Sequence, residues 1–100
     1  MLEVPDAPLF LADNVDLTND SIAALTWQDG HSYGGTPIID YRIWYDQAVG
    51  EFVVLDAGII PQAYQTTITL TKGATYTFRV QARNSVGFSL QSTDLQILVA

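Results

Sequence analysis

The segment over residues 70–80 constrains the fold of this chain more than any other part of it. Leu70 is followed three residues later by Gly73, and Tyr76 comes three residues after that. From Tyr76 onward apolar and polar residues alternate, which is the pattern of a half-buried β-strand. Gly73 suits a tight turn because glycine adopts backbone angles that cost other residues free energy. The segment therefore predicts a turn that leads directly into a strand.

Tyr76 stands at the start of that strand. There its ring can be buried while its hydroxyl reaches a backbone acceptor upstream in the chain. A tyrosine placed in this way forms the tyrosine corner of Greek-key sandwiches. The segment thus predicts an all-β Greek-key sandwich.

The rest of the chain supports an all-β fold. Short β-rich runs are separated by turn residues at regular spacing, and helical periodicity is missing almost everywhere. The runs predict seven strands, over residues 9–12, 21–28, 39–46, 52–55, 65–70, 76–82 and 95–99. Alternation places Ile39 and Tyr45 on the inward face of the third strand. It predicts a core of Trp27, Tyr41, Ile43, Ile68, Leu70, Tyr76, Phe78, Val80 and Ile97.

Composition limits the classes of function. The chain has 100 residues, which suit one domain, and no cysteine, which excludes a disulfide framework or a thiolate metal site. Its formal net charge of −7 disfavours nucleic acid and anionic membrane surfaces, because both attract basic proteins. No apolar run approaches the ~20 residues of a membrane-spanning helix. We expect one module of a longer protein, without membrane insertion.

Four features, in sequence order, resemble the fibronectin type III domain. They are the lead-in at residues 5–8, the second-strand run at 25–27, the approach to the third strand at 34–43, and the tyrosine corner, sixth strand and following loop at 70–87. Together the resemblance covers residues 5–99. One departure is Lys72, where the family usually carries proline.

This resemblance implies a particular architecture. It is a seven-stranded, immunoglobulin-like Greek-key β-sandwich over residues 7–100, preceded by a lead-in or inter-domain linker over residues 1–6. Its structural signature residues are Trp27, Tyr41, Leu70, Gly73 and Tyr76.

The resemblance also implies a role. Fibronectin type III domains are commonly spacer and adhesion modules strung in tandem in extracellular or cell-surface proteins. They also occur in intracellular filament proteins and beside catalytic domains. We therefore predict a non-catalytic spacer and protein-interaction module of a larger multidomain protein, at the cell surface or outside the cell. An accessory role beside a catalytic unit and a cytoplasmic, filament-associated role are the alternatives.

The resemblance bears on partners as well. The expected partners are proteins or neighbouring domains of the same chain, and the isolated domain is expected to be monomeric. The Arg-Gly-Asp tripeptide by which integrin-binding members are recognised does not occur in the sequence. Asn19-Asp20-Ser21 matches the sequon for N-glycosylation, and we interpret this match as chance.

The sequence offers little for catalysis or metal binding. A nucleophilic triad needs a histidine held by an acid, and the one histidine, His31, lies in a glycine-rich loop without a matching serine motif. Asp13, Asp16 and Asp20 gather near the first turn, where carboxylate oxygens would suit Ca²⁺. Their spacing matches no EF-hand loop, so we interpret them as ordinary loop acids. We predict no catalytic residue, cofactor or metal site.

The most specific surface feature follows from strand alternation. If Tyr41 and Tyr76 point inward, the outward residues of the third and sixth strands share one sheet face, because the family pairs these strands. That face gathers three of the four basic residues around a tryptophan. The candidate interaction face therefore consists of Arg42, Trp44, Arg79, Gln81 and Arg83.

Two interpretations of this face remain open. In one, the arginines cover Trp44, with Arg42 or Arg79 stacked on its ring, and pair with acids such as Asp40, Asp46 or Glu51. In the other, aromatic and arginine side chains form a hot spot for an acidic partner. The glycine-rich loop at residues 29–37 is a second candidate for binding. Phe88 is expected to be a hydrophobic plug that closes one end of the sandwich, with an exposed anchor as the alternative.

Overall fold

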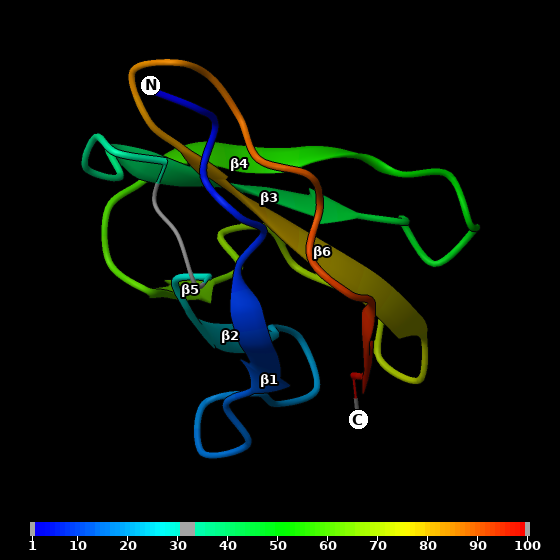
Figure 1. Ribbon diagram of the computed structural model, residues 1–100. Coiled ribbons are helices and arrows are strands. Elements are labelled where there is room, and N and C mark those ends of the chain that lie inside the picture. Colours follow the sequence, from blue (N-terminus) through cyan, green and yellow to red (C-terminus); the bar gives the residue numbers. More distant parts are fainter. Residues whose placement is uncertain (1, 31–33, 100) are drawn as a thin grey trace.

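The computed structural model describes residues 2–30 and 34–99, and its regular elements there are seven β-strands (Figure 1). His31 lies outside the described residues, so its predicted place in a solvated loop is left untested. The strands are β1 (Leu9–Asp13), β2 (Ala24–Gln28), β3 (Asp40–Tyr45), β4 (Val53–Ile59), β5 (Ala63–Gln65), β6 (Thr75–Arg83) and β7 (Leu95–Leu98).

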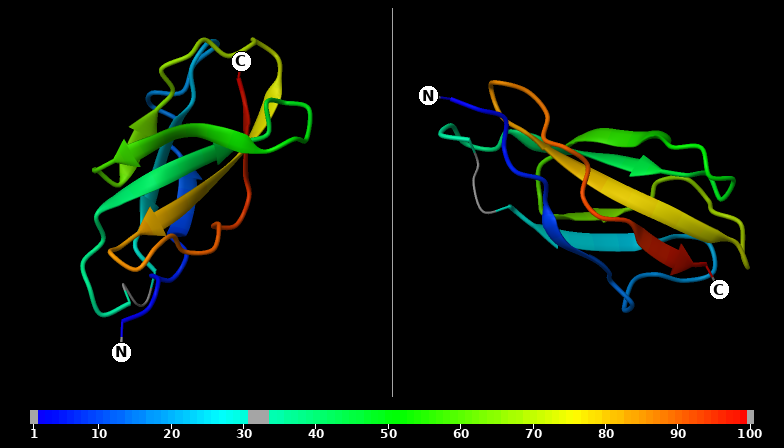
Figure 2. Two further views of the ribbon diagram at one scale, coloured as in Figure 1. Left: turned by 90° about the horizontal axis from the view of Figure 1, so that it is seen from above. Right: turned by 45° about the vertical axis from the view of Figure 1, so that its right-hand side comes forward.

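The strands form two antiparallel sheets, one ordered β1-β2-β5 and the other β4-β3-β6-β7. Figure 1 and both views of Figure 2 show them as two layers that face each other. The third and sixth strands pair along their length, from Asp40 opposite Arg83 to Tyr45 opposite Phe78. The predicted seven-stranded β-sandwich is confirmed.

The core fills the space between the two layers. Ile43, Phe78 and Val80 are fully buried, and Trp27 is 3% exposed. Each of these side chains points inward because strand residues two apart share a face. Every residue of the predicted core is buried except Ile68.

The prediction for Ile68 is wrong, and so are the bounds of its strand. The ladder with β2 covers residues 63–65 rather than 65–70, and Ile68 is 41% exposed. Beyond the ladder, Thr66 bonds to the backbone of Ala23, and the Leu70 N–H donates to the Ser21 carbonyl at 2.7 Å. The chain stays attached at Thr66 and Leu70 but bends between them, which turns Ile68 away from the core.

Other strand boundaries differ from the prediction as well, most of all in β4, which continues to Ile59 instead of ending at residue 55. β2 begins at Ala24 because the Asn19 carboxamide oxygen accepts the backbone N–H groups of Ser21 and Ile22, which holds that segment in a turn. Ile39 was expected to point inward on the third strand. It precedes the first residue of β3 and is 48% exposed, so that prediction is wrong.

β1 carries a β-bulge. The pairing of β1 with β2 shifts between Leu9 and Ala12. Within the bulge, Phe10 has a φ of 57° and is 72% exposed. A left-handed backbone angle is uncommon for a bulky side chain, and bulges are one of the places where it occurs. β1 is an edge strand of its sheet, so the bulge interrupts that edge.

The tyrosine corner is present, with one change from the prediction. The Thr71 backbone N–H donates to the Tyr76 hydroxyl oxygen at 2.9 Å, so this hydroxyl accepts a hydrogen bond in the corner. Gly73 forms the turn with a φ of 86°, and its N–H donates to the Val99 carbonyl at 2.5 Å. The corner thus joins the start of β6 to Val99, the residue after β7.

This bond gives a first prediction. Tyr76→Phe should destabilise the domain by about 1–3 kcal/mol, because it leaves the Thr71 N–H without its acceptor. Tyr45→Phe is the matched control, since Tyr45 stacks beside Tyr76 with ring centroids 6.2 Å apart. Urea unfolding of both variants measures the difference. Equal losses in the two variants would mean that the corner bond adds nothing to stability.

Candidate functional site

Strand register assembles the candidate interaction face. Asp40 lies opposite Arg83, Arg42 opposite Gln81, and Trp44 opposite Arg79 across the β3–β6 pair. The predicted residues are therefore neighbours on the outer side of the four-stranded sheet. We call Arg42, Trp44, Arg79, Gln81 and Arg83 the arginine–tryptophan face. That this face binds a partner stays a prediction.

Gln81 is the hub of the face. Its Oε1 atom accepts from Arg42 Nε at 3.0 Å, from Arg42 Nη2 at 2.8 Å, and from Trp44 Nε1 at 2.6 Å. Its Nε2 atom donates to the Ser89 carbonyl at 2.8 Å, and the residue is buried. One amide therefore orients both the arginine and the tryptophan, and ties them to the segment between β6 and β7.

Aromatic rings lie beneath the Arg42 guanidinium. Its Cζ atom lies 5.2 Å from the centroid of the Trp44 ring and 3.6 Å from that of Phe88. Arg42 is thus the arginine that stacks on Trp44, at distances where cation–π attraction acts. The predicted role of Phe88 as a plug is wrong, because its ring is half-buried under Arg42 and Arg83 on this outer face.

Arg79 is held at the other end of the face. Its Nε atom is 2.5 Å from Asp94 Oδ1, and its Nη1 atom donates to Gln91 Oε1 at 2.9 Å. Its Cζ atom lies 3.8 Å from the centroid of the Phe52 ring rather than over Trp44. The pairing of β6 with β7 brings Asp94 here, an acid that was not among the expected partners of the arginines.

Arg83 forms the second ion pair of the face, with Asp40. Two parallel bonds join its guanidinium to the Asp40 carboxylate, at 2.9 and 2.6 Å. Hydrogen bonding to Asp40 raises the pKa of Arg83 further above its ordinary value. Asp40 is buried, so this bidentate pair satisfies a carboxylate that water reaches poorly. Asp46, another expected partner, instead accepts the backbone N–H groups of Ala48 and Thr77.

Each arginine of the face is therefore engaged within the domain. This arrangement favours the interpretation in which the arginines cover Trp44 and stabilise the outer side of the sheet. It also holds the rings and guanidinium planes in place through contacts within the domain, and side chains that are already ordered lower the entropic cost of binding.

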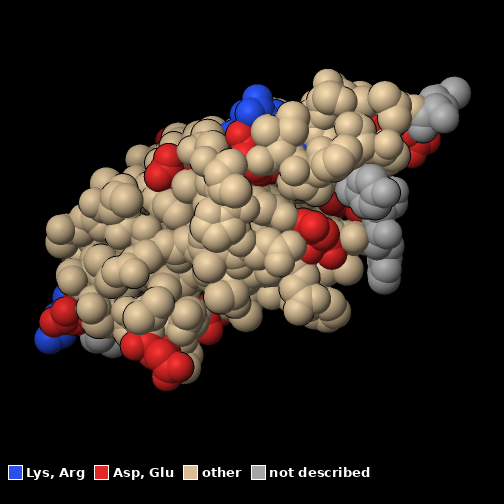
Figure 3. Space-filling view, turned by 90° about the vertical axis from the view of Figure 1, so that its left-hand side faces the viewer, with Lys and Arg blue, Asp and Glu red and all other residues tan. Residues whose placement is uncertain are grey.

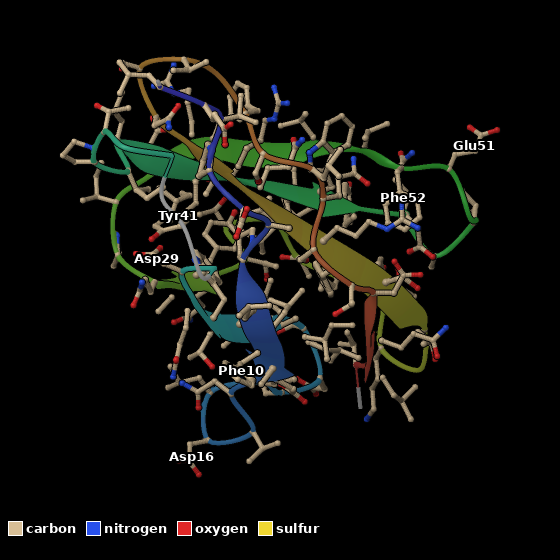
Figure 4. All side chains as sticks on the ribbon, in the orientation of Figure 1. Phe10, Asp16, Asp29, Tyr41, Glu51 and Phe52 are labelled. Carbon is tan, nitrogen blue, oxygen red and sulfur yellow. The ribbon has the colours of Figure 1, made fainter. Side chains whose placement is uncertain are left out.

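A second polar cluster surrounds the signature residue Tyr41 at one end of the sandwich. The Tyr41 hydroxyl donates to Asp29 Oδ1 and accepts from Gln62 Nε2 at 3.3 Å. Figure 4 shows the Asp29 and Tyr41 side chains beside each other. Burial, together with the hydrogen bond to Asp29, raises the pKa of Tyr41 to about 12. The cluster links the ends of β2 and β3 to the segment before β5.

Trp27 packs against this cluster from inside the core. Its ring meets the Tyr41 ring edge to face, with centroids 5.3 Å apart. The indole Nε1 atom is buried and has no hydrogen-bond partner among the described residues. Trp27 therefore contributes to stability by packing rather than by hydrogen bonding.

The predicted acids near the first turn form no metal centre in the described part of the chain, where no group of three metal-ligating side chains comes together. The Asp13 carboxylate instead accepts the Thr18 hydroxyl at 2.5 Å, which is a local turn contact. None of the described residues belongs to a helix long and apolar enough to cross a membrane.

The comparisons with known proteins agree with this geometry. A family model described as the fibronectin type III domain matches residues 6–97. Brother of CDO from Homo sapiens is 32% identical over 90 residues, which cover 87% of this chain and 8% of that protein. The chain thus spans less than a tenth of the length of this relative.

Solved structures show the same fold. A crystal structure of titin domains superposes with a TM-score of 0.87 at 24% identity, covering 98% of this chain and 33% of that one. The titin kinase with its flanking domains gives a TM-score of 0.82 at 26% identity, covering 97% of this chain and 17% of that one. In both cases the matched part is one portion of a longer chain.

The hydrogen bonds of Gln81 give a second prediction. Gln81→Met should destabilise the domain by about 1–3 kcal/mol, because it leaves Trp44 Nε1 and the Arg42 guanidinium without their shared acceptor. Gln96→Met, on the exposed side of β7, is the control and should change stability by less than about 0.5 kcal/mol. Urea unfolding compares the two. If both substitutions prove neutral, Gln81 does not organise the face.

The raised pKa of Tyr41 gives a third prediction. An unfolded tyrosine ionises near its ordinary pKa of 10.0, whereas folded Tyr41 keeps its proton to about 12. The folded chain therefore binds more protons in this window, so stability should fall as pH rises from 10 to 12. Tyr41→Phe should flatten that decline, as measured by unfolding midpoints across the window. A decline of unchanged steepness in the variant would assign it to other groups.

Proposed function

We infer that this chain, which belongs to the fibronectin type III family, serves as a non-catalytic spacer and protein-interaction module within a larger multidomain protein. In Brother of CDO and in the two titin structures the matched part is a portion of a longer chain, which supports the modular part of the proposal. The observation that carries the spacer role is the attachment of the two ends of the domain to opposite ends of β6.

The N-terminal lead-in is attached where β6 ends. Asn84, the residue after β6, donates from its side-chain Nδ2 atom to the Glu3 carbonyl at 2.7 Å. The Glu3 N–H donates to the Gly34 carbonyl at 2.9 Å. Pro5 and Pro8 are buried in the same lead-in. The described part of the predicted linker at residues 1–6 therefore packs on the domain.

The C-terminal end is attached where β6 begins. The Val99 N–H donates to the carbonyl of Ala74, the residue before β6, at 3.0 Å. The nine residues of β6 span about 30 Å, so the two attachments are separated by most of the 46 Å long axis. The right-hand view of Figure 2 shows the two ends of the chain at opposite ends of the molecule. A neighbour on each side would thus be held at a fixed separation.

The proposed partners are neighbouring domains of the same chain and other proteins. The arginine–tryptophan face is proposed as a rigid outer surface whose charges are balanced internally. A location outside the cell or at its surface stays a prediction, as does the monomeric state of the isolated domain.

A tandem of two copies joined head to tail tests the spacer role. Gly34 of the second copy has a φ of 82°, and a Cβ atom there would collide with the Glu3 carbonyl. Gly34→Ala should therefore detach the lead-in. Small-angle scattering should show the unmodified tandem as a rod about twice as long as the 46 Å axis of one domain. The variant tandem should have a shorter average length and a broader distribution of lengths.

Gly50→Ala in the second copy is the matched control. Gly50 has a φ of 86°, so alanine there meets similar backbone strain, but no atom lies within 4 Å of the added Cβ. The control tandem should keep the length of the unmodified one. If the unmodified tandem already scatters as a flexible pair, the docked lead-in does not fix the joint and the spacer proposal fails.

A further inference from the structure

A cavity of about 380 Å³ opens at the end of the sandwich that holds the Tyr41 cluster. Asp29 follows β2, Ile60 follows β4, and the remaining walls come from the start of β3 and the residues before it. The cavity therefore lies where the two sheets part. Its described lining is Asp29, Pro37, Ile38, Ile39, Tyr41 and Ile60.

The walls of this cavity combine aliphatic side chains with the polar side chains of Asp29 and Tyr41, and they are partly open to water. Ile60 is 68% exposed and Ile39 is 48% exposed, although both are large aliphatic side chains. Covering such side chains is favourable in proportion to the apolar area removed from water. The volume falls near the lower end of the range for small-ligand sites. The cavity therefore has room for one long side chain.

The charged group in the described lining of the cavity is the Asp29 carboxylate. Tyr41 donates to one of its oxygens, and no described residue donates to the other. The hydroxyl thus orients the carboxylate while leaving an acceptor directed elsewhere. Asp29 is exposed, so a donor of an occupant can reach this second oxygen in place of water.

No Lys or Arg side chain among the described residues pairs with this carboxylate. The ion pairs of the described residues join Arg79 to Asp94 and Arg83 to Asp40. Arg42 is bonded to Gln81, and Lys72 lies in the turn before β6 at the far end of that strand. On the face shown in Figure 3, acidic side chains are scattered while basic ones stay at the margins. With a net charge of −7, the domain favours a cationic occupant.

We propose that this cavity binds a lysine or arginine side chain of a partner polypeptide. The aliphatic stem lies against Ile39 and Ile60, and the cationic head donates to Asp29. Long basic side chains combine these two requirements, since they bury their methylene stems while the charged head stays near water. The inference rests on the proposed interaction role, and the cavity residues Asp29, Ile39 and Ile60 do not belong to the arginine–tryptophan face.

A pair of blocked pentapeptides tests the proposal. One carries a central lysine between alanines, and the other carries norleucine, which keeps the stem and lacks the charge. Titration into the isotopically labelled domain, followed by amide chemical shifts, should give saturable changes centred on Asp29, Ile39 and Ile60 for the lysine peptide. The norleucine peptide should bind at least about tenfold more weakly, because it lacks a charge-assisted bond.

Two substitutions separate a specific site from general attraction to an acidic protein. Asp29→Asn removes the charge but keeps an oxygen that accepts from Tyr41, and it should weaken the lysine peptide about tenfold. Asp16→Asn removes the same charge from an exposed turn and should change affinity by less than about twofold. Butylammonium, the stem and head without a backbone, should bind more weakly than the peptide.

Three results would overturn the proposal. One is an equal loss in Asp29→Asn and Asp16→Asn, which would indicate attraction by net charge alone. Another is shift changes spread over the whole surface, or none at the highest peptide concentration. The third is tighter binding of butylammonium than of the peptide, which would make the site one for a small organic cation. The scattering experiment on the tandem does not depend on these titrations. The spacer role and the binding of a basic side chain in the cavity can therefore be refuted separately.

Discussion

The pairing of β3 with β6 is the interaction on which the rest of the structure depends. Six consecutive residue pairs, from Asp40 opposite Arg83 to Tyr45 opposite Phe78, fix the register of the four-stranded sheet. A shift by one residue would exchange inward and outward side chains along the whole strand. The same register therefore sets both the aromatic core and the charged outer surface. The core and the arginine–tryptophan face thus both depend on the pairing of β3 with β6.

Much of the fold could be predicted because its strands alternate clearly. The two-residue period of a strand was enough to predict inward positions for Tyr41, Ile43, Phe78 and Val80. All four are buried. Ile68 has the same period, but the pattern does not record that the chain leaves the ladder after residue 65. The direction of the Tyr76 hydrogen bond was missed for a similar reason, since residue types do not fix which partner donates.

The candidate site was predictable as a set of residues but not as a network. Alternation and the pairing expected from the family brought Arg42, Trp44 and Gln81 together. The roles of Phe88 and Asp94 depend on the path of the chain after β6, which carries no regular pattern in its sequence. The Asp29–Tyr41 contact likewise joins the end of one strand to the inner face of another. Such contacts are set by tertiary packing, and no local signal in the sequence marks them.

The bulge in β1 has a consequence for encounters between two copies of this domain. An edge strand presents unpaired backbone groups, and neighbouring copies at high local concentration can join through such edges into aggregates. The positive φ of Phe10 breaks the regular spacing of those groups on β1. A second copy would find no continuous ladder there to extend. The backbone conformation of one residue therefore helps to keep two copies of the domain from joining into a common sheet.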